Sequence, residues 1–281
     1  MEAARPSRTA LRVAMRRAAH QLYDAQPLVF DDPIAVPILG PEYLPEVERT
    51  QFKLNKPFSI SLRAHMVARS RYAEDLLAQA VSGGVDQYVL LGAGLDTFAY
   101  RNPFPNVHVF EIDHPATQQW KRELLAANSI SIPQSLTYVP VDFEHQRLSE
   151  QLAAAGFDST RPAFFAWLGV VPYLTEDAFR STLSLIASSP AGSGVVMDYG
   201  QPRSALPHLE QLAHDSLASR VQLAGEPFQL FFTPPEMAAE LSAFRSLEDL
   251  GSQEINARYF ANREDGLKLR GTSSRIVSAW V

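Results

Sequence analysis

A glycine turn between two apolar segments constrains the fold of this chain more than any other feature. Residues 88–91 (Tyr-Val-Leu-Leu) predict a buried strand, and Gly92-Ala93-Gly94 follows at once. Glycine lacks a Cβ atom, so the backbone can turn sharply there and approach a ligand at contact distance. A second apolar segment at 107–112 ends in Asp113. A strand, a glycine turn, a crossover and a strand ending in a carboxylate are the layout of a nucleotide-binding α/β unit.

The residues around the turn restrict the nucleotide. A dinucleotide site takes a third glycine where this chain has Thr97, and Asp96 places a negative charge in the loop. That charge would repel a pyrophosphate, whereas it is compatible with a cationic, phosphate-free ligand such as S-adenosylmethionine. Asp113 can accept hydrogen bonds from ribose hydroxyls, or it can cap the helix that Pro115 begins. The sequence therefore predicts an adenosine ligand, with an ordinary strand-to-helix turn as the alternative.

Strands and helices alternate along the rest of the chain. Further strands are predicted at 136–141, 163–168, 195–199, 247–251 and 274–280, and helices at 8–24, 60–81, 115–127, 148–155, 176–187, 205–223 and 235–243. The proline-rich segment 27–57 predicts loops and short helical turns. Strands separated by helices imply an α/β fold whose mostly parallel sheet is covered on both faces. A chain of 281 residues can form one such domain.

Composition argues against several classes of protein. The formal charge of -6 leaves no global basic field, so nucleic acid is not an expected partner. The absence of cysteine excludes disulfides, thiolate zinc sites and cysteine nucleophiles, and it fits a cytoplasmic location. No histidines have metal-ligand spacing, so no metal is expected, and no apolar run is long enough to span a membrane. The basic first twenty residues fit a surface helix or a transit peptide.

Several blocks of sequence resemble the leucine carboxyl methyltransferase family, most closely its bacterial branch of S-adenosylmethionine-dependent methyltransferases. They are the Leu-Gly-Ala-Gly-Leu-Asp-Thr turn, the Phe-Glu-Ile-Asp-His-Pro strand end and Val141-Asp142-Phe143, and the likeness runs from Asp31-Asp32-Pro33 to Ile276. The resemblance implies a class I methyltransferase sheet of seven strands, mostly parallel with the last antiparallel, and S-adenosyl-L-methionine as cofactor. It also implies a single domain with a helical cap (1–81), a cofactor-binding core (82–200), a helical lid (201–244) and closing strands (245–281).

The resemblance assigns cofactor-binding roles to individual residues. Arg69 would hold the methionyl carboxylate, for which its planar guanidinium suits it, although an arginine on a helix is more often solvated. Gly92 and Gly94 would form the turn beside the cofactor, and Asp113 would bind the ribose. Asp142 and Phe143 would flank the adenine, although Asp142 could instead be only a turn residue.

The segment 166–174 contains the main departure from the family. Related sequences carry a cofactor-binding glutamate where this chain has Leu168. Its absence implies either that another group takes over its hydrogen bonds or that the pocket is more apolar. Tyr173 and Tyr199 could line the substrate pocket, or they could be packed aromatic residues.

These observations lead to an expected function. The chain is predicted to be an S-adenosylmethionine-dependent O-methyltransferase that esterifies a carboxylate of a small molecule, such as a polyketide-like metabolite. A carboxylic acid ordinarily has a pKa of about 4 and is already ionised at neutral pH, so no general base and no catalytic residue are assigned. The apolar lid residues Phe228, Leu230, Phe231 and Phe232 favour a small apolar acid, or they pack beneath a loop.

Other acceptors and other classes stay open at this point. A protein carboxyl group or a hydroxyl group could accept the methyl, and a hydroxyl would more often need a base such as His20, His65, His114, His208 or His214. A nicotinamide-dependent oxidoreductase could share the fold, and the departure at Leu168 also allows a non-catalytic cofactor binder. The sequence does not specify the oligomeric state.

Overall fold

A mixed sheet of seven strands lies at the centre of the computed structural model, which describes residues 7–51, 55–142, 146–223 and 225–281. The strands are β1 (Gln87–Leu91), β2 (His108–Asp113), β3 (Leu136–Pro140), β4 (Phe164–Trp167), β5 (Gly194–Gly200), β6 (Ser246–Leu250) and β7 (Ser274–Trp280). Their order is β3-β2-β1-β4-β5-β7-β6. Strands β1 to β5 are parallel, and β7 runs antiparallel to both of its neighbours. The predicted sheet, with its antiparallel last strand, is confirmed.

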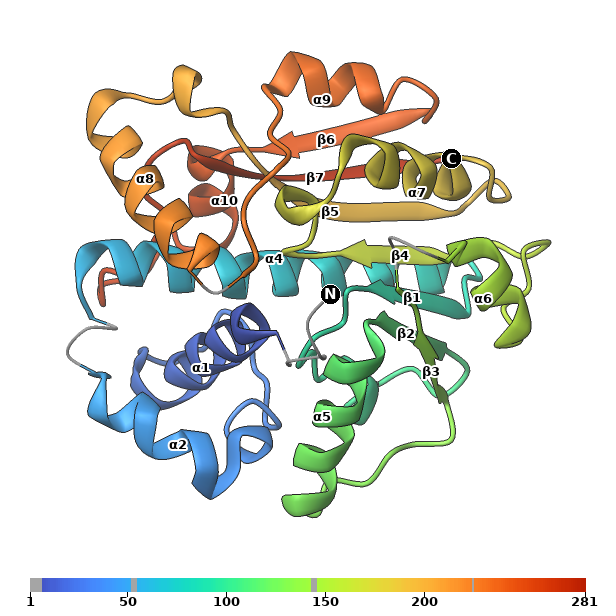
Figure 1. Cartoon of the computed structure of the whole chain (residues 1–281), viewed down its shortest axis with the longest axis horizontal. Helices are drawn as coiled ribbons and strands as arrows, with labels where there is room; N and C mark the ends of the chain where they lie inside the picture. The colour runs from blue at the N-terminus through green and yellow to red at the C-terminus, as the bar shows by residue number, and fades with distance from the viewer. Residues whose placement is uncertain (1–6, 52–54, 143–145, 224) are drawn as a thin grey trace.

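Helices cover both faces of this sheet (Figure 1). Helices α4 (Pro57–Ser82) and α10 (Ser252–Tyr259) pack on one face, and α6 (Leu148–Ala154), α7 (Glu176–Ala187) and α9 (Pro234–Glu240) pack on the other. Because side chains alternate along a strand, Tyr88 and Leu90 of β1 face the first set of helices, whereas Val89 and Leu91 face the second. Both faces of β1 are therefore buried, as its continuous apolar sequence predicted.

The remaining helices lie mostly near the strand ends. Helix α1 (Arg8–Tyr23) packs against α2 (Gly40–Arg49) and α4, and α5 (Pro115–Ala127) adds Leu124 and Leu125 to the same cluster. Short 3-10 helices occupy Pro37–Leu39 (η1), Phe98–Tyr100 (η2), Val171–Tyr173 (η3) and Arg203–Ala205 (η4). Figure 1 shows α1 and α8 (His208–Gln222) on the side toward which β4 and β6 point. Within the expected cap segment, α4 belongs to the core, and α1 and α2 form the part beside the strand ends.

Two helices differ from the sequence-based expectation. Helix α2 runs through part of the segment expected to form loops and short helical turns, and it contains Pro45. Helix α10 was not predicted, although Glu254 accepts a hydrogen bond from the Gly251 amide and so satisfies a free N–H at its start. Among the described helices, none is both long and apolar enough to cross a membrane.

Candidate active site

A cavity of about 390 Å³ opens beside the glycine turn, at the carboxyl ends of β1, β2 and β4. Its wall combines α1, the turn itself, α4, the loop that follows β4 and the segment 225–229 after α8. The carboxyl edge of a parallel sheet is where α/β proteins bind ligands, because the strand-to-helix loops converge there. Six of the residues proposed from the sequence line this cavity, namely Arg69, Gly92, Gly94, Asp113, Leu168 and Tyr173.

The glycine turn has a backbone that other residues would strain. Gly92 and Gly94 have φ angles of 68° and 51°, which lie in the left-handed region that favours glycine. A Cβ atom on Gly92 would overlap the side chain of Val170, and one on Gly94 would lie 3.1 Å from Cβ of Ala10. The turn is therefore a close-fitting backbone surface in the cavity wall, as a nucleotide-binding turn requires.

Asp113 lies at the end of β2 with its carboxylate against this turn. Its Oδ2 accepts a hydrogen bond from the Gly94 amide at 2.5 Å, and its Oδ1 accepts one from the His114 amide at 2.7 Å. Helix α5 is capped by His114, whose Nδ1 accepts from the Ala116 amide, so Asp113 is not the capping residue. Burial raises the pKa of Asp113, and the two backbone donors oppose that rise. A carboxylate offers about four acceptor positions, so two are left for a ligand.

The charge of Asp96 is partly compensated, which the sequence did not indicate. Its Oδ1 accepts from the Phe98 amide at 2.8 Å, and its Oδ2 lies 3.5 Å from Nη1 of Arg17. Thr97 donates at 2.6 Å to Asp32, which is fully buried. The Asp31-Asp32-Pro33 and Leu-Asp-Thr blocks are thus in contact. Because Arg17 offsets the charge of Asp96, this carboxylate would repel a pyrophosphate less strongly than the sequence alone implied. Asp96 is therefore weaker evidence for S-adenosylmethionine over a dinucleotide.

Arg69 projects from α4 into the cavity wall and is only 7% exposed, so it is not a solvated helix residue. Its Nη1 donates to Oδ2 of Asp198 at 2.7 Å. Its guanidinium also lies against Gly169, where an added Cβ atom would come within 2.7 Å of Nη2. The middle of α4 is buried around Arg69, which is why this charge needs a partner inside the protein.

Asp198, near the end of β5, is the partner that sequence reasoning missed. Besides Arg69, it accepts from the Gly169 amide at 2.5 Å and lies 3.2 Å from Nε2 of His65. Burial would raise the pKa of Asp198, but Arg69, His65 and the Gly169 amide together hold it well below its usual range. One sequence signal could have indicated this residue, because it is a lone carboxylate near the carboxyl end of an apolar strand.

Tyr173 and the first turn of α1 meet at another part of the cavity. Burial raises the pKa of Tyr173 to about 12, although the side chain of Thr9 opposes that rise. Thr9 donates to the carboxylate of Glu226, through its amide at 3.2 Å and through its hydroxyl. Leu168 lines the same cavity and is partly buried. The cap helix and the segment after α8 are therefore tied together beside the cavity.

Among the described residues, two of the sequence-based candidates do not line the cavity, namely Asp142 and Tyr199. Asp142 follows β3, and its amide donates to the side chain of Gln146 at 2.9 Å. Phe143 lies outside the described residues. Tyr199 is buried in the core, where its hydroxyl donates to Asp249 at 2.7 Å, which is the position of a packed aromatic residue.

The apolar residues of the lid segment pack against one another and against the core. The ring of Phe228 lies 5.2 Å from that of Tyr173 and 6.0 Å from that of Phe231, and Phe232 lies 5.0 Å from Phe179. The four lid residues Phe228, Leu230, Phe231 and Phe232 do not line the cavity, whereas Tyr173 does. They correspond to the packing alternative that the sequence left open.

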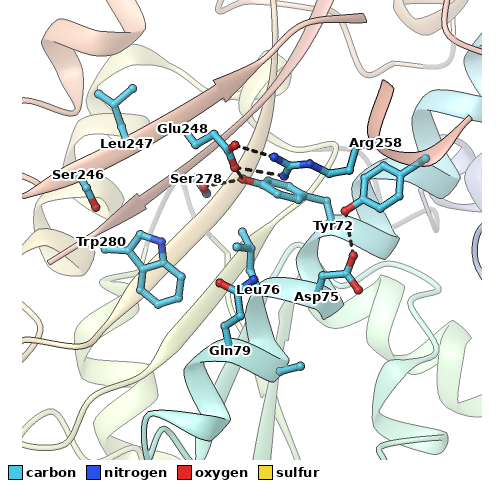
Figure 2. Close-up of a pocket in the computed structure, with 12 residues that line it drawn as sticks. Tyr72, Asp75, Leu76, Gln79, Ser246, Leu247, Glu248, Arg258, Ser278 and Trp280 are labelled. Carbon is cyan, nitrogen blue, oxygen red and sulfur yellow. Dashed lines mark hydrogen bonds and ion pairs between the residues drawn. The ribbon is translucent and has the colours of Figure 1, made fainter. Parts of the chain in front are cut away.

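A wider hollow of about 630 Å³ lies between α4 and the β6–β7 pair (Figure 2). Its polar side chains bind one another: Tyr72 and Arg258 donate to Glu248, and Tyr259 donates to Asp75. Trp280 in its wall pairs with Gly194, so the hollow extends to the amino edge of the parallel strands. Because its charges are internally paired and it lies away from the glycine turn, the smaller cavity is the candidate active site.

Comparisons with known proteins agree with this assignment. A family model described as leucine carboxyl methyltransferase matches residues 10–187. "Putative S-adenosyl-L-methionine-dependent methyltransferase YktD" of Bacillus subtilis (strain 168) is 33% identical over 286 residues, which cover 93% of each chain.

Solved structures share the fold. A "putative methyltransferase" from Thermobifida fusca has a TM-score of 0.58 at 18% identity, over 87% of this chain and 91% of its own. A duf574 family protein from Streptomyces avermitilis has a TM-score of 0.55 at 20% identity, over 87% of this chain and 94% of its own. At these identities the likeness concerns the fold alone.

Proposed function

The chain belongs to the leucine carboxyl methyltransferase family and is an S-adenosylmethionine-dependent methyltransferase, and we propose that it methylates a carboxylate oxygen of a small-molecule acceptor. When bound, the cofactor supplies an electrophilic methyl group on a sulfonium. The tasks left to the protein are to hold cofactor and acceptor in line and to exclude water. Such positioning contributes roughly 7 to 11 kcal/mol in well-aligned cases.

The cavity residues fit the cofactor at both of its ends. The two acceptor positions left on Asp113 would receive the ribose hydroxyls, and the glycine turn would pack against the nucleoside. Arg69 would hold the methionyl carboxylate with donors that Asp198 does not use. Leu168 would offer an apolar contact. By likeness to the family, Asp142 and Phe143 would flank the adenine.

The observation that carries the carboxylate proposal is that the carboxylates and the histidine in the described lining of the cavity already accept hydrogen bonds from the protein. The only histidine there, His114, uses its Nδ1 to cap α5, and the pKa of Tyr173 is too high for a base at neutral pH. Efficient general bases have pKa values near the working pH. An acceptor that is already ionised needs none, which favours a carboxylic acid over a phenol or an alcohol.

The cap and the lid favour a small acceptor. Thr9 of α1 and Glu226 are hydrogen-bonded to each other in the cavity wall. We propose that α1 and the lid segment 201–244 cover the cavity. A cavity covered in this way would admit a small acid more readily than the end of a folded protein.

Methyl transfer from labelled S-adenosylmethionine tests the acceptor class. We expect label in small organic acids but not in matched alcohols, phenols or peptides with a free carboxyl end. The label should be released as methanol in mild base, because methyl esters hydrolyse and methyl ethers do not. Base-stable label in the hydroxyl compounds would replace the carboxylate proposal by hydroxyl methylation.

A further inference from the structure

Asp198 is buried behind the cavity wall and holds a cationic residue of the site. It is 6% exposed, and its carboxylate has partners from two other segments, namely Arg69 and His65 on α4 and the Gly169 amide after β4. Asp198 itself does not line the cavity, whereas Arg69 and Gly169 do. The carboxylate therefore acts on whatever occupies the cavity through Arg69 and the loop that contains Gly169.

The guanidinium of Arg69 is fixed from two directions. Asp198 binds its Nη1, and the missing side chain of Gly169 leaves the space against which the planar group lies. An unrestrained arginine has large rotamer entropy, which a ligand would have to overcome on binding. Because the protein has already ordered this side chain, its unused donors have a fixed direction before any ligand arrives.

We propose that Asp198 is a positioning residue that aims Arg69 at the amino-acid end of the cofactor. The inference rests on the proposed cofactor role of Arg69. The negative charge that compensates Arg69 therefore comes from Asp198 on β5 and not from position 168, which is a leucine in this chain. The two positions are neighbours in the sheet, because Trp167, which precedes Leu168, pairs with Met197, which precedes Asp198. The adenosine end, held by Asp113 and the glycine turn, does not depend on Asp198.

Two probes separate these ends of the site. S-adenosylhomocysteine carries the amino-acid group, and methylthioadenosine lacks it. For D198N, calorimetry should show affinity for S-adenosylhomocysteine reduced on the order of 10-fold, the loss of one hydrogen bond to a charged group, and affinity for methylthioadenosine unchanged. A role confined to general stability would reduce both affinities together, so the ratio of the two dissociation constants is the decisive quantity.

Y72F is a matched control, because Tyr72 lies on α4 near Arg69 and its hydroxyl makes a buried hydrogen bond with Ser278 at 2.8 Å, besides the one to Glu248. We expect this variant to lose stability with no change in the ratio. If D198N fails to fold, G169A tests the same contact from the other side, since its new methyl group would displace the guanidinium. It should lower the affinity for S-adenosylhomocysteine selectively.

The outcomes separate the inference from the proposed function. Failure of the wild-type chain to bind S-adenosylhomocysteine would overturn the proposed function and the inference with it. Normal binding by the wild-type chain, combined with an unchanged ratio in the folded variant, would overturn only the positioning role of Asp198. A selective loss of S-adenosylhomocysteine affinity in D198N or G169A but not in Y72F supports it.

Discussion

Replacing Asp113 by asparagine is expected to lower the affinity for S-adenosylhomocysteine at least about 100-fold, because two hydrogen bonds to a charged group are weakened together. The carboxylate accepts from the Gly94 and His114 amides and has two acceptor positions left for the ribose. The asparagine NH₂ group would also face a backbone donor, so stability should fall by about 1 to 3 kcal/mol. Calorimetric titration and urea unfolding measure the two effects.

The pH dependence of this affinity has a defined sign. Burial raises the pKa of Asp113, and only the ionised carboxylate can accept from both amides and the ribose. The affinity of the wild-type chain should therefore fall as the pH decreases through that raised pKa, whereas D113N should lack this component. D177N, an exposed substitution on α7, is the control. An unchanged affinity in D113N would mean that Asp113 only orders the turn.

Replacing Lys121 by methionine should have the largest effect on stability. Lys121 on α5 is 1% exposed and donates at 2.7 Å to Glu111 of β2, which is fully buried. Removing one partner of a buried ion pair costs about 3 to 5 kcal/mol, because it leaves the other charge without compensation. Urea unfolding at pH 8 should show this loss, and E111L/K121M should recover much of it, since an apolar pair replaces both charges.

The decrease in the free energy of unfolding that K121M causes should become smaller as the pH is lowered. Burial raises the pKa of Glu111 to about 7, even though Lys121 opposes the rise, and without Lys121 the pKa should be higher still. The folded state then binds a proton more tightly than the unfolded chain, where a glutamate titrates at about 4.3. Folding therefore becomes more favourable as the pH falls from 8 toward 5. An equal loss at both pH values would exclude Glu111 as the source.

The sequence predicted the sheet well because most of its strands are apolar segments bounded by a turn or a helix start, with the mostly exposed β6 as the exception. Gly92 and Asp113 indicated the carboxyl edge of the sheet, where the structure has a cavity lined by both residues. Helix α2 was missed since Pro45 within it reads as an interruption, and tertiary packing of Val47 overrides that local signal. Helix α10 was missed because it is short and half of its residues are exposed.

The buried charge partners in and behind the site could not be predicted from local pattern. Arg69 was predicted to face the cofactor, but its partner Asp198 is 129 positions away, and only the fold brings α4 beside β5. Arg17 and Asp96 meet in the same way, across 79 positions. The sequence could not show whether Tyr199 is a pocket residue or a packed aromatic residue. Its burial depends on the pairing of β5 with β7, and its hydroxyl donates to Asp249, which is far away in the sequence.

A calorimetric titration of the wild-type chain with S-adenosylhomocysteine and, separately, with NAD tests the central assignment most directly. One cavity brings together the glycine turn, the Asp113 carboxylate and the fixed guanidinium of Arg69, which we propose bind the nucleoside, the ribose and the amino-acid carboxylate of the cofactor. We predict saturable binding of S-adenosylhomocysteine at one site per chain and no heat with NAD. Saturable heat with NAD and none with S-adenosylhomocysteine would contradict the account.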